Sequence, residues 1–198
     1  MFKTVGASAI ILYDHKYIFE IQKSKKWQVN SHSEVRIGVG CIGGAIESGE
    51  RPLETLQREA LEEIGTKIEI IEWQHPFTIT ADLDVQDIHL GEEDNTLFFH
   101  WFGTKEPYRA CRVCVFLGKI IEKPVPDDLG GVLATDIKLL MDCLEKDLTL
   151  KQGIEQGMEI YYKDRIPLMA KIKAVGTVKK ITELYKSHKW RIQYLLDK

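Results

Sequence analysis

The stretch that decides the fold is GAIESGERPLETLQREALEEIGT, residues 44–66. Its second half predicts an amphipathic helix from Pro52 to Ile64. Proline suits the first helical position, because its missing N–H has no intrahelical partner there, and Gly65 suits the position just past the end. At 100° per residue one face of this helix is apolar, and we expect it to contact the core. That face consists of Leu53, Leu56, Ala60 and Ile64.

A neighbouring face of the same helix carries three glutamates at positions i, i+3 and i+4, namely Glu59, Glu62 and Glu63. Carboxylates this close together repel one another. Either the face is solvated and relieved by ion pairs to Arg58, or a cation binds there. Oxygen ligands alone favour a hard cation, Mg²⁺ or Mn²⁺. The helix by itself does not decide between the two interpretations.

The residues before the helix favour the cation. The stretch resembles the Nudix box, which runs Gly, five residues, Glu, seven residues, then Arg-Glu-U-x-Glu-Glu-x-Gly-U, where U is aliphatic. All seven fixed positions are matched, by Gly44, Glu50, Arg58, Glu59, Glu62, Glu63 and Gly65. At about 5–7% per residue type, this coincidence occurs by chance about once in 10⁸ to 10⁹ windows. Two of the aliphatic positions depart from the motif, because Ala60 is small and Thr66 is polar. These two departures affect packing and leave the charged residues of the motif unchanged.

The resemblance implies a fold, an activity and a cofactor. Nudix hydrolases are α/β/α sandwiches with a mixed sheet. They cut a pyrophosphate linkage, usually in a nucleoside diphosphate joined to another group, with the help of divalent cations. The resemblance therefore implies that Mg²⁺, or Mn²⁺, is bound by the Gly44 carbonyl and by Glu59, Glu62 and Glu63.

The resemblance also implies catalytic roles. Glu59 and Glu62 would act in catalysis, and Arg58 and Glu50 would hold the carboxylates in position. Family members differ in their general base, and some take it from a later loop. In this chain the loop before the final helix of the domain offers Asp127 and Asp128.

Candidate substrate contacts lie just upstream of the motif. A phosphate group requires Arg or Lys, and a flat base requires an aromatic ring. Arg36, Lys26 and Trp27 are of these types. The alternatives are that the lysine is a solvated surface residue and that the tryptophan belongs to the core.

Hydrophobic patterning predicts a strand-rich body. Strands are expected at residues 5–14, 16–24, 66–73, 96–102 and 109–121, the first two joined by a turn at Asp14-His15. Residues 22–36, 81–95 and 123–131 have the polar, acidic or Pro/Gly-rich composition of loops. Asp136 is a candidate N-cap for a helix to about Glu145, and the remainder from about residue 148 is expected to be helical, with breaks near Pro167 and Gly176. Mostly hairpin-spaced strands predict a mixed sheet with helices packed on it.

Charge divides the chain unevenly. We expect a Nudix domain over residues 1–147 and a basic, helical C-terminal extension over residues 148–198, packed on it. Residues 163–198 contain ten Lys and Arg against three Asp and Glu, a local charge of +7. Because the whole chain has a net charge of −3, the first 162 residues have a net charge of −10. We consider four roles for such a tail: docking on the acidic body, closing over the active site, forming a homodimer, and binding an anionic substrate or RNA. Docking is the preferred interpretation.

Three rival motifs are weaker. Residues 38–43 match GxGxxG, but no helix follows at once, as a dinucleotide site requires. Cys111 and Cys114 form a lone CxxC on a predicted strand, where i and i+3 point to opposite faces. Cys41 raises the alternative of an isopentenyl-diphosphate isomerase, although a small buried thiol is the simpler role. A further alternative is a catalytically silent Nudix-fold module that binds a nucleotide or regulates.

Composition limits the remaining classes. The chain has 198 residues, of which 44% are hydrophobic and 29% charged, and this excludes disordered, collagen-like and coiled-coil proteins. Its longest nearly uncharged apolar run has ten residues, whereas a membrane span needs about 20. Four cysteines form no disulfide framework, which fits a reducing, cytoplasmic compartment. The sequence thus predicts a cytoplasmic pyrophosphohydrolase with a small nucleotide-type substrate and no membrane partner.

Overall fold

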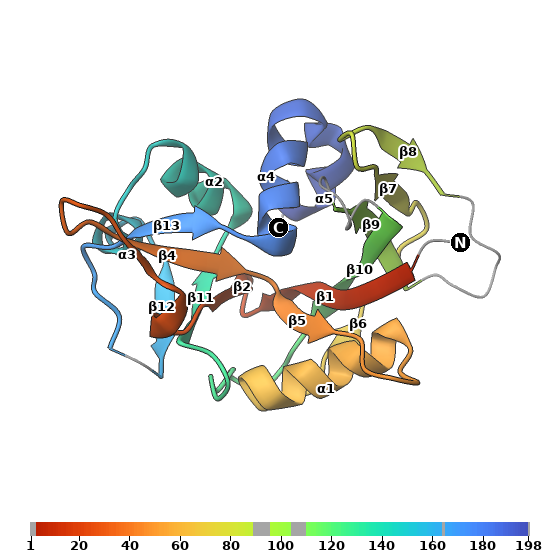
Figure 1. The fold of residues 1–198 in the computed structure, drawn as a ribbon, viewed down its shortest axis with the longest axis horizontal. Coiled ribbons are helices and arrows are strands. Elements are labelled where there is room, and N and C mark those ends of the chain that lie inside the picture. The colour runs from red at the N-terminus through yellow and green to blue at the C-terminus, as the bar shows by residue number, and fades with distance from the viewer. Residues whose placement is uncertain (1–2, 89–95, 104–109, 164, 198) are drawn as a thin grey trace.

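A twisted mixed β-sheet runs through the centre of the molecule in the computed structural model, which describes residues 3–88, 96–103, 110–163 and 165–197 (Figure 1). Its strands are β1 (Lys3–Tyr13), β2 (Lys16–Ile21), β3 (Gln28–Val29), β4 (Val35–Gly40), β5 (Ile42–Ala45), β6 (Glu69–Ile70), β7 (Phe77–Ile79), β8 (Val85–Asp87), β9 (Leu97–Phe102), β10 (Cys111–Lys119), β11 (Gly131–Thr135), β12 (Glu159–Tyr162) and β13 (Lys171–Ala174). The helices are α1 (Pro52–Ile64), α2 (Ile137–Glu145), α3 (Leu150–Glu155), α4 (Gly176–Ser187) and α5 (Gln193–Leu196), with 3₁₀ turns at Ser24–Lys26 and Lys189–Ile192.

Strand β1 organises the sheet, in the order β12-β11-β2-β1-β10-β9-β7-β8. It pairs in parallel with β10 on one side. On the other side it pairs antiparallel first with β5 and then with β2. The β1–β2 hairpin turns at Asp14 and His15, which both have positive φ, as the sequence predicted. Because parallel and antiparallel pairs occur together, the expected mixed sheet is confirmed.

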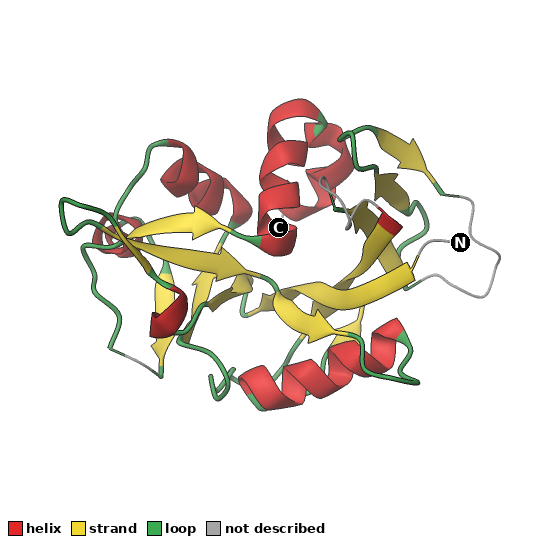
Figure 2. Ribbon diagram, viewed as in Figure 1, coloured by secondary structure: helices red, strands yellow, loops and turns green. Residues whose placement is uncertain are grey.

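Helices cover both faces of this sheet (Figure 2). Alternate residues of a strand point to opposite faces, and β1 supplies Ile11 to one core cluster and Ile10 to the other. The Ile11 cluster includes the apolar residues of α1. The Ile10 cluster includes those of α2, α4 and α5. The α/β/α sandwich predicted from the sequence is therefore confirmed.

The C-terminal extension differs from the sequence expectation, because it is not wholly helical. Strand β12 pairs antiparallel with β11, and β13 pairs in parallel with β4. Each of these strands has four residues, too few for an alternating pattern to distinguish a strand from a helix. The helical prediction holds for α3, α4 and α5. The domain division after residue 147 stays a prediction.

Other elements also differ from the sequence expectation. The strand predicted at 66–73 is reduced to β6, and the loop predicted at 22–36 contains a 3₁₀ turn, β3 and the start of β4. The acidic segment 81–95 contains β8, and its residues 89–95 lie outside the described part of the chain, as do residues 104–109. The glycine-rich stretch from residue 38, to which the sequence pattern assigned no element, forms the end of β4 and β5. Within the described ranges, we find no helix with both the length and the apolar character of a membrane span.

Candidate active site

Helix α1 begins and ends at the residues that the sequence predicted. Pro52 is its first residue, and the Glu54 carboxylate accepts a hydrogen bond from the Arg51 N–H at 2.8 Å, which closes the first turn. Gly65 ends it with φ +71°, a left-handed conformation that glycine adopts without strain. Of the expected apolar face, Leu56, Ala60 and Ile64 are at 0% exposure, and Leu53 is partly buried against the same core cluster. This burial fixes the direction in which the glutamates project.

Two of the box glutamates pack against the glycines of β5. A Cβ added at Gly44 would lie 2.2 Å from Glu59 Oε1, so a side chain at this position would displace that carboxylate. The Gly43 N–H donates to Glu63 Oε2 at 3.0 Å. Strand β5 is therefore in direct contact with the acidic face of α1. The Gly44 carbonyl faces the neighbouring strand, because a Cβ added at Gly6 would lie 3.1 Å from it.

Arg58 joins the Glu59 carboxylate to two further ones, Glu50 and Glu62. Its guanidinium donates to Glu50 Oε1 at 2.8 Å, to Glu59 Oε1 at 2.8 Å and to Glu62 Oε2 at 3.2 Å. Glu50 also accepts from the Thr55 hydroxyl at 2.6 Å. The hydrogen bonds from Arg58 and Thr55 lower the pKa of Glu50 to about 2. Arg58 thus holds the carboxylates together.

Glu20 is a fifth carboxylate of this site, and sequence reasoning missed it. It lies on β2, opposite Gly40 of β4, and a Cβ added at Gly40 would lie 2.9 Å from Glu20 Oε2. Burial raises the pKa of Glu20, the nearby Lys26 and Lys23 lower it, and Glu59 raises it. The alternation of β2, with Glu20 on the face opposite Phe19 and Ile21, was the available signal. The pairing of β2 with β4, which the pattern did not reveal, brings Glu20 to the site.

Negative charge is incompletely compensated in this cluster. Burial raises the pKa of Glu63 to about 8, the Gly43 N–H opposes the shift, and the charges of Glu20, Glu59 and Asp128 add to it. Burial of carboxylates next to other carboxylates is costly unless a cation is present. Glu20 on β2 and Glu63 on α1 therefore both have a raised pKa in this cluster.

The donor set suits a hard cation, although it is not arranged around one. All of the side chains offer oxygen, the ligand that Mg²⁺ and Mn²⁺ prefer. Across the described ranges, no three acidic, histidine or cysteine side chains lie near enough together to hold a metal ion without moving. The reason is that Arg58 engages Glu59 and Glu62, while Glu63 faces the Gly43 N–H. A cation would have to draw the Glu59 and Glu62 carboxylates away from Arg58.

The later loop with Asp127 and Asp128 docks on the end of α1. The Asp127 N–H donates to the Glu63 carbonyl at 2.9 Å and the Asp128 N–H to the Glu62 carbonyl at 3.2 Å. Their carboxylates form ion pairs with Lys163 and Lys23 respectively. Both side chains are at least 70% exposed. The loop therefore lies beside the box, and Lys23 and Lys163 lie along the edge of the site.

The three expected substrate-contact residues, Lys26, Trp27 and Arg36, have different surroundings in the structure. Lys26 is exposed and lies close enough to Glu20 to lower its pKa. Trp27 is half-buried against the core, and its indole N–H donates to the Gln22 carbonyl at 2.7 Å. Arg36 lies four residues before Gly40 on β4, a distance of about 13 Å along an extended strand. It takes part in other ion pairs there.

Those ion pairs form what we call the ion-pair quartet, Glu34, Arg36, Asp147 and Lys171. Arg36 donates two hydrogen bonds to Asp147, at 2.8 and 3.0 Å, and its Nε donates to Glu34 at 3.0 Å. Lys171 Nζ lies 2.6 Å from Asp147 and 2.9 Å from Glu34. Lys171 and Arg36 together lower the pKa of Asp147. The quartet connects β4 to the C-terminal extension. Other ion pairs, including Lys163–Asp127 and Arg191–Asp87, also join the basic tail to the rest of the chain.

The cysteines lie apart from any reactive setting. Cys41 is 7% exposed in the core between β4 and β5, and burial raises the pKa of its thiol. Cys111 and Cys114 lie on β10, as predicted, and Cys114 is buried. All four cysteines are free. The burial of Cys41, Cys114 and Cys143 is typical of structural thiols.

Comparison with known proteins gives a family. A family model described as the NUDIX domain matches residues 3–109, more than half of the chain. Among solved structures, a NUDIX-family hydrolase from Clostridium perfringens is 14% identical, over 64% of this chain and 74% of its own, with a TM-score of 0.40. A NUDIX hydrolase from Nitrosomonas europaea is 11% identical, over 95% of this chain and 73% of its own, with a TM-score of 0.41. A search of curated proteins found no match.

Proposed function

The chain belongs to the Nudix family, and we propose that it is a Mg²⁺-dependent hydrolase that cuts a pyrophosphate linkage in a nucleoside diphosphate joined to another group. Mn²⁺ is the alternative cation. The observation that carries this proposal is the incompletely compensated acidic cluster at the box, in which Glu59 abuts Gly44 and Glu63 accepts from the Gly43 N–H. A surface that only needed solubility would have no use for buried, mutually repelling carboxylates.

Cation binding is assigned to the carboxylates of Glu59, Glu62 and Glu63, with Glu20 as an added ligand or close neighbour. The Gly44 carbonyl remains a candidate ligand from the family motif. When bound, a divalent cation neutralises the pyrophosphate and lowers the pKa of a polarised water. Arg58 then retains Glu50, and their charge-assisted hydrogen bonds at 2.8 and 3.2 Å orient the helix face.

The proton of the attacking water needs a carboxylate that is open to solvent. Glu62 is the most exposed of the box glutamates that pair with Arg58, with 55% of its side chain exposed. Asp127 and Asp128 are the candidates from the later loop. Exchanging each for its amide and measuring the pH profile of kcat distinguishes them, because only loss of the base removes the lower limb of the profile.

Lysines along the rim suit an anionic substrate. Lys23, Lys25 and Lys163 lie close enough to Asp128 to lower its pKa, the hydrogen bond from Lys23 having the largest effect. Lys26 lies near Glu20. Positive side chains beside an acidic, cation-binding floor are what a polyphosphate requires. We propose that Lys26 and its neighbours contact the phosphates that leave, with Trp27 beside them and Arg36 held in the quartet.

The test is a Mg²⁺-dependent hydrolysis screen over ADP-ribose, dinucleotide polyphosphates, nucleoside triphosphates, sugar nucleotides and capped RNA. We expect turnover of one of these groups by the wild-type protein, and loss of it in the Glu62→Gln, Glu63→Gln double variant. Glu54→Gln is the matched control, because it lies on the same helix and Gln still accepts from the Arg51 N–H. It should retain wild-type activity.

A specific alternative is a catalytically silent module that binds a nucleotide or regulates. It would bind nucleotide yet release nothing from any of the five groups, and that outcome would replace the hydrolase proposal. An isomerase with Cys41 as its catalytic residue is tested by Cys41→Ala, which should retain activity because this thiol is buried with a raised pKa.

A further inference from the structure

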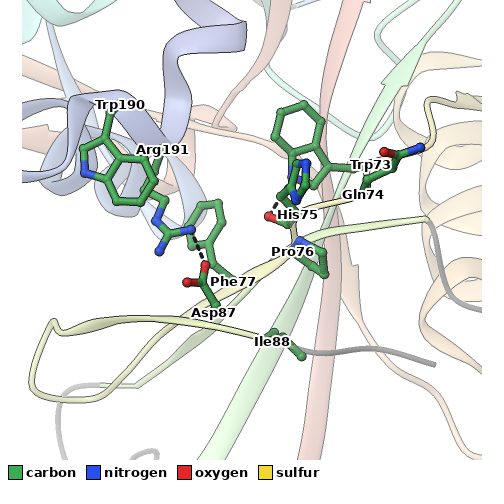
Figure 3. A pocket seen from close by; sticks show the side chains of 9 residues that line it. All are labelled: Trp73, Gln74, His75, Pro76, Phe77, Asp87, Ile88, Trp190 and Arg191. Atoms are coloured by element: carbon green, nitrogen blue, oxygen red, sulfur yellow. Dashed lines mark hydrogen bonds and ion pairs between the residues drawn. The ribbon is translucent and has the colours of Figure 1, made fainter. Parts of the chain in front are cut away.

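A cavity of about 530 Å³ opens beside β7 and β8, at one end of the strand order (Figure 3). Its walls come from the segment before β7, from β7 and β8, and from the 3₁₀ turn at Lys189–Ile192. Two tryptophans, Trp73 and Trp190, line it together with Phe77 and Arg191. Figure 3 shows Trp190 and Arg191 on one side of the cavity and Trp73 on the other. No lining residue belongs to α1 or β5, so this cavity is separate from the Nudix box.

The aromatic walls are held in place by their neighbours. The Trp73 indole N–H donates to the His75 carbonyl at 2.9 Å, and its ring packs edge-on against Phe98 and Tyr194. The Arg191 guanidinium lies over the Trp190 ring at 3.9 Å and over the Phe77 ring at 5.4 Å. An aromatic surface that is already fixed loses little conformational freedom when a ligand binds.

Polar groups in the cavity complement an edge that both donates and accepts hydrogen bonds. Arg191 forms an ion pair with Asp87, and only 11% of the Arg191 side chain is exposed. Among the described residues, Arg191 Nε is a buried donor without a hydrogen-bond partner. Asp87 offers carboxylate oxygens and is 63% exposed. At this edge the Arg191 guanidinium supplies hydrogen-bond donors and the Asp87 carboxylate supplies acceptors.

Trp190 gives the cavity an exposed aromatic ring, one face of which is covered by the Arg191 guanidinium. It is 64% exposed, although tryptophan is usually well buried in a folded protein. Exposed tryptophan next to a guanidinium is a stacking platform for flat, π-bonded rings. The cavity volume falls within the about 300–1,000 Å³ of small-ligand sites.

We propose that this cavity binds a nucleobase, stacked on the Trp190 side of the cavity with its edge toward Arg191 and Asp87. A nucleobase fits because it combines a flat aromatic ring with donors and acceptors on one edge. A purely apolar ligand would remove water from the Asp87 carboxylate without replacing its hydrogen bonds, and a compact cation would be repelled by the guanidinium. The site takes the base of a free nucleotide without a divalent cation, so it is independent of hydrolysis at the box.

The test measures binding of guanosine and adenosine 5′-monophosphates by calorimetry in EDTA, with ribose 5-phosphate as the ligand that lacks a base. EDTA removes divalent cations, and a monophosphate contains no pyrophosphate linkage. We expect saturable binding of at least one nucleotide and none of ribose 5-phosphate. Trp190→Ala should weaken binding by about tenfold or more, Trp190→Phe should restore most of it, and Asp87→Asn should alter the preference between the two bases.

Two controls keep the result specific. Tyr162→Ala removes another exposed aromatic, on β12, and should leave the affinity unchanged. The Glu62→Gln, Glu63→Gln variant should bind as the wild type does, even if its hydrolysis is lost. Absence of saturable binding, or an affinity that Trp190→Ala leaves unchanged, would overturn the proposal. So would sedimentation showing that Trp190→Ala turns a dimer into a monomer, because the cavity would then be an interface between copies.

Discussion

The two charged clusters of this protein are opposite in kind. In the ion-pair quartet two acids face two bases, the pKa values of Glu34 and Asp147 are lowered, and those of Arg36 and Lys171 are raised. At the box, carboxylates outnumber the one arginine that holds them, and the pKa of Glu63 rises to about 8. A balanced cluster holds the fold together. An unbalanced one is costly to the fold, and this cost is the basis of the cation site that we propose.

The largest expected effect tests whether the C-terminal side is structural. Removing residues 163–198 deletes β13 and α4, including Ile172, Val178, Ile181 and Leu184, all at most 4% exposed. Each such side chain contributes about 1.5–3 kcal/mol on burial, against a total stability of about 5–15 kcal/mol. We therefore expect circular dichroism to show an unfolded chain. A folded, active truncated protein would mean that the quartet and its surroundings are dispensable.

The next effect tests whether the unbalanced cluster is functional. Glu59→Gln should lower kcat/KM by about 100-fold or more, because a cation ligand is lost. Its melting temperature should stay level or rise, because the substitution removes a like-charge neighbour of Glu62 and Glu63. Parallel activity assays and thermal melts measure both. If activity and melting temperature fall together, Glu59 is a structural residue and the contrast between the clusters fails.

Cation binding should stabilise only the protein with an intact box. Mg²⁺ or Mn²⁺ at about 100 times its Kd should raise the free energy of unfolding by about 2.7 kcal/mol. Glu59→Gln should abolish this gain, and Asp147→Asn should leave it intact. Denaturant titrations with EDTA or with the cation give the comparison. An equal gain in both variants would show that the cation binds elsewhere.

The smallest effect concerns the quartet and pH. Asp147 has a pKa below its ordinary 3.8 in the fold, so its stabilisation is present above about pH 4 and is lost as the pH falls through the folded-state pKa. With about 40% of this side chain exposed, we expect Asp147→Asn to cost less than about 1 kcal/mol at pH 7. The difference from wild type should shrink toward zero below pH 4. Urea unfolding at pH 7 and pH 3 tests this, and a difference that grows on acidification would contradict it.

Local signals account for what the sequence predicted well. The bounds of α1 follow from Pro52, Gly65 and an apolar period of 3.6, all within 14 residues, and the turn at Asp14-His15 is equally local. Glu20 could not be found this way, because its place beside the box depends on the pairing of β2 with β4. The pairing of β13 with β4 joins residues about 135 apart in the chain. The cavity combines Trp73 with Trp190 and is likewise a product of the tertiary structure.

The pairing of β13 with β4 also bears on how the chain is made. Strand β4, which ends at Gly40 beside Glu20, has no partner along its β13 edge until residues 171–174 have been synthesised. An unpaired strand edge is a template for pairing with another chain. A ribosome-bound chain that stalls before residues 171–174 would therefore expose an unpaired edge of β4 that can pair with another chain. We expect the nascent chain to depend on chaperone protection late into translation.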